Sequence, residues 1–152
     1  MHLLLDFYER ESEQFQDLVA QVSGTEGPSD PLVAEDLRCM AEEELRQALD
    51  VVSLMPESAN TTARDLRDRY ETLRSSGSTA EDWQVSSNLL VGARATVLQY
   101  LRALDARLYL EPCSTPNGVI TPGELVRGMV EDSSRRVSVA TKRVSGVKGG
   151  AD

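Results

Sequence analysis

Apolar residues recur at spacings of three and four in five stretches of the chain, which is the periodicity of one face of an α-helix. These stretches predict helices at about residues 2–22, 31–55, 62–74, 80–110 and 122–143. Alternating β-branched runs, which would predict strands, are nearly missing from the sequence. Because most of the connections are short, we predict an all-α, up-and-down helical bundle of about five helices.

The longest of these stretches, Glu81 to Leu110, contains no proline and one glycine. We expect it to form one long helix and to be the central packing element of the bundle. Its apolar face comprises Leu90, Ala93, Val97, Leu101, Leu104 and Leu108, and a neighbouring stripe of small residues comprises Gly92, Thr96, Ala103 and Ala106. Small side chains let two helices approach closely, so the stripe predicts a surface that packs another helix of this chain or of another subunit.

Several helix ends carry recognisable start signals. Asp30 can cap a helix that begins with Pro31, and Thr121 with Glu124 forms a capping box with proline at the first helical position. Weaker capping boxes, Thr62 with Asp65 and Ser78 with Glu81, are expected before the third and fourth helices.

The segment 111–123 is rich in proline and predicts a loop. Its Asn117-Gly118 pair favours a tight turn, followed by a short extended piece at Gly118–Ile120. Beyond the last helix, residues 144–152 are expected to form a flexible tail, which leaves residues 1–143 as a single helical-bundle domain.

The composition, 40% hydrophobic and 27% charged over 152 residues, is that of one soluble globular domain. The two cysteines, Cys39 and Cys113, are expected to be reduced. The apolar run Leu3–Leu5 is interrupted at once by Asp6, so it does not predict a signal peptide, and no apolar run is long enough to span a membrane. We therefore expect a cytoplasmic or other reducing intracellular compartment and no secretion.

The net charge of −9 is unevenly distributed along the chain. Residues 1–57 hold 14 acidic and 3 basic side chains, net −11, whereas residues 58–152 hold 11 acidic and 13 basic, net +2. An acidic first third would repel phosphates, which argues against nucleic-acid binding there. It could instead steer a basic protein partner through Glu42, Glu43 and Glu44, or it could be a solvated helix face.

The sequence offers few residues for catalysis. Its one histidine, His2, lies beside the chain terminus, and this argues against serine or cysteine triads and histidine-based metal sites. No glycine-rich phosphate-binding motif is present. We predict a protein that is not an enzyme and uses no cofactor and no metal.

Two further groups of charged residues could form sites. Asp65, Asp68 and Glu71 could in principle bind Mg²⁺, but the arginines interleaved with them favour exposed ion pairs. The basic residues near the C-terminus lack interleaved aromatic residues and lie close to Glu131 and Asp132, which argues against nucleic-acid binding.

The leading hypothesis is a helical interaction or assembly protein that binds another protein, or itself as a homo-oligomer, through helix faces. Its candidate interface residues are Trp83, Gly92, Thr96, Ala103, Glu42, Glu43 and Glu44. One alternative is an acidic inhibitor, immunity protein or chaperone that covers a basic partner. Another is a carboxylate–magnesium enzyme of the helical-bundle type. The sequence leaves open whether the first and last helices pack within one chain or across two.

Overall fold

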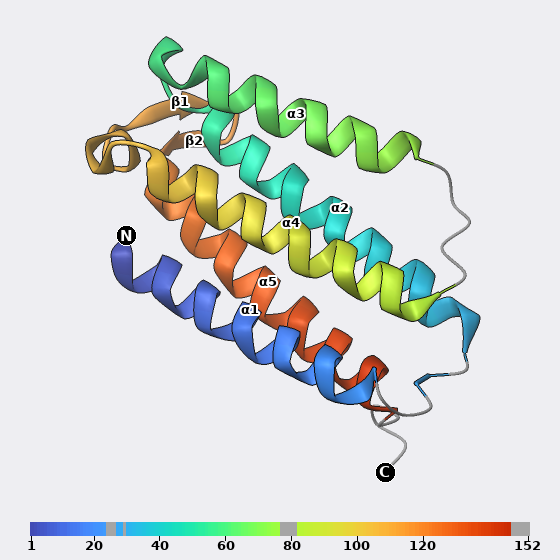
Figure 1. The fold of residues 1–152 in the computed structure, drawn as a ribbon. Coiled ribbons are helices and arrows are strands. Elements are labelled where there is room, and N and C mark those ends of the chain that lie inside the picture. The colour runs from blue at the N-terminus through green and yellow to red at the C-terminus, as the bar shows by residue number, and fades with distance from the viewer. Residues whose placement is uncertain (24–26, 29, 77–81, 147–152) are drawn as a thin grey trace.

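The computed structural model describes residues 1–23, 27–28, 30–76 and 82–146. Within them lie five α-helices: α1 (His2–Val22), α2 (Pro31–Ser53), α3 (Asn60–Ser75), α4 (Trp83–Ala103) and α5 (Pro122–Ser145). Two short 3-10 turns, η1 (Glu57–Ala59) and η2 (Ala106–Tyr109), and a hairpin of β1 (Cys113–Thr115) with β2 (Gly118–Ile120) complete the described elements. Successive helices run in opposite directions (Figure 1), so the predicted all-α, up-and-down bundle is confirmed.

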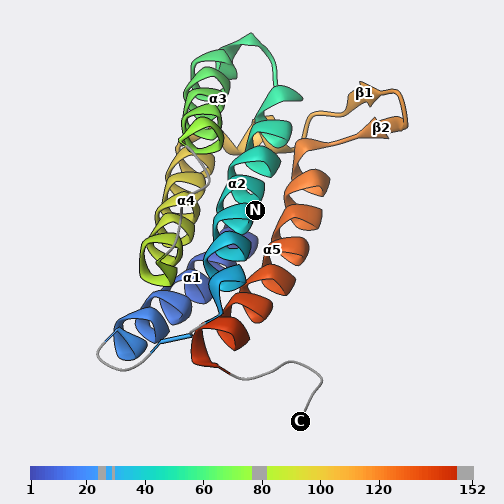
Figure 2. The same cartoon turned by 90° about the vertical axis from the view of Figure 1, so that its right-hand side faces the viewer.

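Helix α2 is the centre of the bundle. It packs against three helices, α3, α4 and α5. Helix α1 packs against α4 and α5 but not closely against α2 (Figure 2). The prediction that the stretch after residue 80 would be central is therefore wrong. Helices α1 and α5 run side by side in the same direction and pack within this chain, which answers the question that the sequence left open.

The core is mainly aliphatic, with aromatic side chains contributed by α1 and η2. In α1 the buried positions are Leu5, Tyr8, Phe15 and Val19, and Leu4, Leu18 and Val22 are partly buried and pack against this core. In α2 and α4 the expected apolar faces are largely buried. The fully buried aliphatic side chains include Leu37, Val51, Val52, Leu66, Leu90, Val97 and Leu101.

The fourth helix is shorter than predicted. It ends at Ala103, because Leu104 adopts an extended backbone with φ −80° and ψ 147°. The carboxylate of Asp105 then accepts a hydrogen bond from the Arg107 amide at 3.0 Å and starts η2, which turns Tyr109 into the core. The buried hydroxyl of Tyr109 donates to the carbonyl of Leu101 and fastens this turn to the end of α4.

Other helix ends follow the sequence more closely. Asp30 Oδ1 accepts from the Leu32 amide at 2.9 Å, and Thr121 Oγ1 accepts from the Glu124 amide at 3.2 Å, so both predicted caps are confirmed. Helix α4 is capped by Asp82, which accepts from the Gln84 amide at 2.8 Å. The proposed cap Ser78, with residues 80 and 81 of the predicted helix, lies outside the described residues.

The start of α3 and the end of α5 differ from their predicted positions. Helix α3 begins at Asn60 with no side-chain cap, so the expected box of Thr62 with Asp65 does not form. Helix α5 continues to Ser145, two residues past the predicted end at 143, and buries Val144; Gly146 then closes the helix with φ 78°.

The hairpin after η2 confirms the predicted turn. Gly118 at its tip has φ 118°, a conformation that glycine adopts easily, and pairs with Thr115. The hairpin projects from the end of the bundle (Figure 2). No described helix is long and apolar enough to cross a bilayer.

Gly92 and Gly128 lie on exposed faces inside α4 and α5, and a Cβ added at either would meet no atom within 4 Å. We therefore expect Gly92→Ala and Gly128→Ala each to raise the free energy of unfolding by about 1 kcal/mol, the helix-propensity difference between the two residues. Urea unfolding measures both effects. As a control, Gly146→Ala should destabilise the domain because of its positive φ. A destabilised Gly92→Ala variant would contradict the open surface described for α4.

Candidate functional site

A cluster of charged and hydroxyl side chains lies inside the bundle where α1, α2, α4 and α5 meet. Arg94 and Glu44 are both fully buried, and Arg94 Nη1 donates to Glu44 Oε1 at 2.5 Å. The same guanidinium donates to Ser133, to Ser12 Oγ at 2.7 Å through Nε, and to the Tyr8 carbonyl at 3.0 Å through Nη2. We call Arg94, Glu44, Ser133, Ser12 and Arg136 the buried polar cluster.

Glu44 is the anionic centre of the buried polar cluster. Its Oε1 also accepts from the Ser133 hydroxyl, and its Oε2 accepts from Arg136 Nη2 at 2.8 Å. Arg136 donates in addition to Gln47 Oε1 at 2.7 Å, nearer the surface. Each charge therefore has an opposite charge and neutral hydrogen-bond partners, the condition under which a buried ion pair is tolerated.

The ring of Tyr8 forms one wall of this cluster. The Arg94 guanidinium carbon lies 4.0 Å from the ring centroid, which is a close cation–π contact. Burial raises the pKa of the Tyr8 phenol well above its ordinary value of 10.0, and the charge of Glu44 raises it further against the opposing effect of Arg94 and Arg136. Because Arg94 and Glu44 are sealed from solvent, the cluster orders the four helices and does not offer an open site for chemistry.

Sequence reasoning missed this cluster. Glu44 was expected on an acidic surface, and that expectation is wrong because its side chain is 0% exposed. The available signal was that Arg94 falls on the same helical face as Leu90, Val97 and Leu101. A charged residue inside an apolar stripe predicts a buried ion pair, but the sequence alone does not identify its partner.

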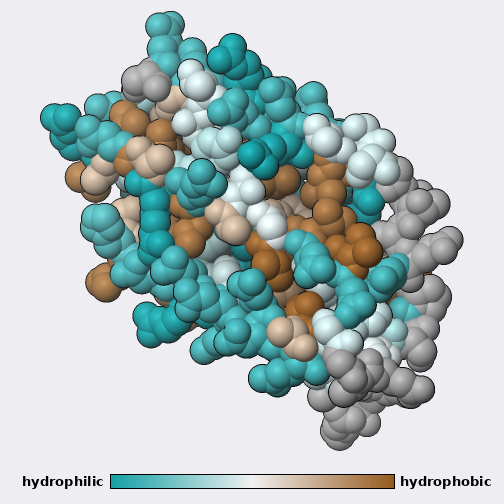
Figure 3. Space-filling model, viewed as in Figure 1, coloured by the Kyte–Doolittle hydropathy of each residue, from teal (hydrophilic) through white to brown (hydrophobic). Residues whose placement is uncertain are grey.

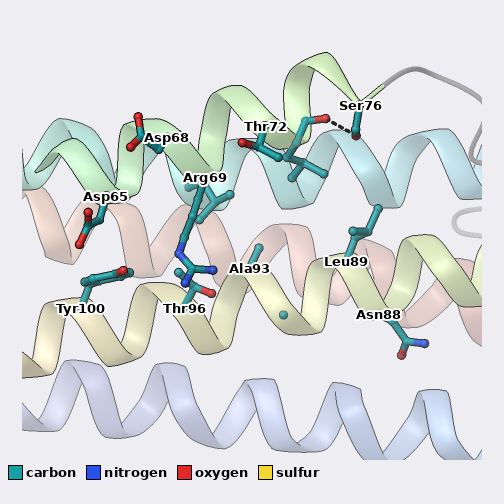
Figure 4. A pocket seen from close by; sticks show the side chains of 13 residues that line it. Asp65, Asp68, Arg69, Thr72, Ser76, Asn88, Leu89, Ala93, Thr96 and Tyr100 are labelled. Carbon is teal, nitrogen blue, oxygen red and sulfur yellow. Dashed lines mark hydrogen bonds between the residues drawn. The ribbon is translucent and has the colours of Figure 1, made fainter. Parts of the chain in front are cut away.

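A groove separates α3 from α4 on the surface of the molecule. Both helices pack against α2, and α3 packs little against α4. This α3/α4 groove has a volume of about 770 Å³. It is lined by Leu45 of α2, by Asp65, Asp68, Arg69, Thr72, Leu73 and Ser76 on the α3 side, and by Asn88, Leu89, Gly92, Ala93, Thr96 and Tyr100 of α4. Hydrophobic side chains gather on this face of the molecule (Figure 3), and the lining residues are drawn in Figure 4.

The charges at the groove are not paired with each other. Arg69 extends from α3 toward α4 (Figure 4), and its guanidinium carbon lies 5.8 Å from the centroid of the Tyr100 ring. Asp65 and Asp68 make no ion pair within the part of the chain that the structure describes. The expected ion pairs along α3 are likewise missing among the described residues, because none of its charged side chains lies close enough to an opposite charge.

The structure divides the candidate interface residues among several places. Gly92 and Thr96 line the α3/α4 groove, whereas Ala103 is exposed at the end of α4 and does not line it. Trp83 is partly buried and packs against the core, and its ring lies where a Cβ on Gly27 would be. Glu43 pairs with Arg46 on the surface and Glu42 is half-buried, so the three glutamates form no continuous acidic surface.

The described residues contain no group of three or more His, Cys, Asp or Glu side chains that could hold a metal ion. Asp65, Asp68 and Glu71 therefore form no such group in this structure. The α3/α4 groove is a surface concavity lined by side chains of three helices.

Replacing Glu44 by Gln should lower the free energy of unfolding by about 3–5 kcal/mol, because it leaves the Arg94 guanidinium buried without an opposite charge. Arg94→Met should cost less, since Glu44 keeps its contacts with Arg136 and Ser133. The double variant Glu44→Leu/Arg94→Met should be more stable than Glu44→Gln. Urea unfolding of the three variants measures the order of their stabilities. Equal losses for both single variants would contradict the assignment of Glu44 as the shared anion.

Stability should fall as the pH rises above about 10. Burial also raises the pKa of Tyr109, so Tyr8 and Tyr109 keep their protons in the folded state under conditions where unfolded tyrosine has lost its own. Each tyrosine should then remove about 1.4 kcal/mol of stability per pH unit. When the free energy of unfolding is measured from pH 8 to pH 11, it should fall less steeply for Tyr8→Phe and for Tyr109→Phe than for the unchanged chain. Tyr100→Phe, at the half-buried groove position, serves as the control. An unchanged slope in both core variants would disprove the shifts.

Comparisons with protein-family models, with curated proteins and with solved structures find no match to this chain.

Proposed function

We propose that this chain is a non-enzymatic protein-binding module that accepts an α-helix of another protein in the α3/α4 groove. The observation that supports this proposal is the groove itself. Helices α3 and α4 both pack against α2 but little against each other. Apolar side chains of all three helices line the space of about 770 Å³ between them. Isolated exposed apolar residues are normal on a protein surface, but a lined groove between two helices is not explained by internal packing.

The lining suits a helix in particular. An amphipathic helix binds a groove by inserting apolar side chains spaced three and four residues apart. Gly92 and Thr96 stand on the α4 wall, where a bound helix could approach closely because these side chains are short. The partly buried Leu73 and Leu89 supply apolar surface for its anchors, above the buried Leu45.

The two alternatives from the sequence receive less support. A basic partner covered by Glu42, Glu43 and Glu44 would lose its central contact, since Glu44 is buried. A carboxylate–magnesium enzyme has no candidate ligand group among the described residues.

The test is site-specific photo-cross-linking in the cells that express the chain. A photo-reactive residue at Thr72, which lines the groove, should yield one discrete cross-linked protein. Gly92→Leu should abolish that product by filling the groove, and because a Cβ at this position meets no atom within 4 Å we expect the fold to stay intact.

The matched control is Gly128→Leu, which adds the same side chain to an exposed position of α5 and should leave cross-linking unchanged. Light scattering at several concentrations is the second measurement. A strictly monomeric chain that gives no cross-linked protein from Thr72 would contradict the proposed function.

A further inference from the structure

We infer that the helix bound in the α3/α4 groove belongs to a partner protein and carries Lys or Arg beside its apolar face, opposite Asp65 and Asp68. The inference rests on the proposed function and specifies the chemistry of the partner.

The first argument is the state of the two carboxylates. Asp65 is half-buried and Asp68 exposed, both line the groove, and neither has an ion-pair partner among the described residues. A helix that settles into the groove removes water from the rim, and an unpaired carboxylate there would resist binding. A cation at the edge of the incoming helix removes that penalty.

The second argument is the charge of the remaining lining. The α4 wall contributes only uncharged residues, among them Asn88 and Thr96. The one cation of the lining, Arg69, is held over the Tyr100 ring and lies between the two walls (Figure 4). Among the lining side chains two carboxylates stand against one engaged guanidinium, Arg38 is committed to Leu73 and Ser76 at one end of the groove, and the whole chain has a net charge of −9. This sign attracts a basic segment and repels the phosphates of nucleic acids and lipids.

A second copy of this chain is the alternative occupant. The face of α3 beside the groove presents polar residues such as Asp65, Thr72 and Ser76, so it offers no apolar stripe to a facing copy. The exposed apolar pair Leu3 and Phe7 of α1 flanks Asp6, which is already paired with Arg102, so a second copy is kept as an outcome of the test below.

The test uses three synthetic amphipathic helices with one shared apolar face and flanking positions that are Lys, Gln or Glu. Fluorescence anisotropy gives the Kd of each peptide for the full chain at low and high salt. The Lys peptide should bind about tenfold more tightly than the Gln peptide, the effect of two partly screened ion pairs, and the Glu peptide more weakly than both. High salt should reduce the differences.

Variants of the chain locate the effect. Asp65→Asn/Asp68→Asn should remove the tenfold advantage of the Lys peptide, whereas Arg69→Gln should increase it, because that change removes a like charge from the groove. The control Glu13→Gln/Asp17→Asn neutralises two exposed carboxylates of α1 that also make no ion pair within the described residues, and it should leave the Kd unchanged.

The outcomes separate this inference from the proposed function. If the Glu or Gln peptide binds as tightly as the Lys peptide and Gly92→Leu blocks it, the groove binds a helix and the basic partner is wrong. If no peptide binds, or if Gly92→Leu affects none of them, the proposed function falls and this inference with it. A dimer in light scattering that Gly92→Leu dissociates would identify a second copy as the occupant and overturn the inference.

Discussion

The arrangement of the four core helices depends on one buried ion pair, Arg94 with Glu44. A guanidinium that is fully removed from water must have its donors satisfied in fixed directions, and here they reach groups on α1, α2 and α5 from a single residue of α4. Such a pair adds little net stability compared with an apolar replacement, but any shift of one helix along another would leave a buried charge unpaired. The cluster therefore specifies how the helices align, and the aliphatic core supplies the driving force.

Helix α3 takes no part in that network. It is attached to α2 through Leu66 and its apolar neighbours and through Arg38, whose Nη2 donates to the Leu73 carbonyl at 2.5 Å. The bundle thus consists of a four-helix core held by polar and apolar contacts and of one helix added to its outside. The groove exists because this added helix covers α2 without closing onto α4. The lining of the groove and the buried polar cluster consequently share no residue.

Most local features of this fold could be predicted from the sequence, although the expected box of Thr62 with Asp65 does not form, and features that depend on contacts between distant segments could not. The caps at Asp30 and Thr121 and the turn at Gly118 follow from interactions within a few residues, so their sequence signals were sufficient. The end of α4 at Ala103 depends on Asp105 and on the burial of Tyr109, which compete with an otherwise unbroken helical pattern. Gly92 and Thr96 were identified as a packing surface, but the groove also needs the position of α3, which periodicity does not give.

The parallel course of α1 and α5 has a mechanical consequence. The two helices lie side by side, with the start of α1 at the hairpin end of the bundle and the end of α5 at the opposite end (Figure 1). A force that pulls the two ends of the domain apart would act along both helix axes, so their shared interface would be loaded in shear. Contacts such as Ser134 with Glu11, joined at 2.9 Å, would then bear the load together and would not open one after another. A chain of this topology can resist stretching while its α3/α4 groove, on a different pair of helices, stays unloaded.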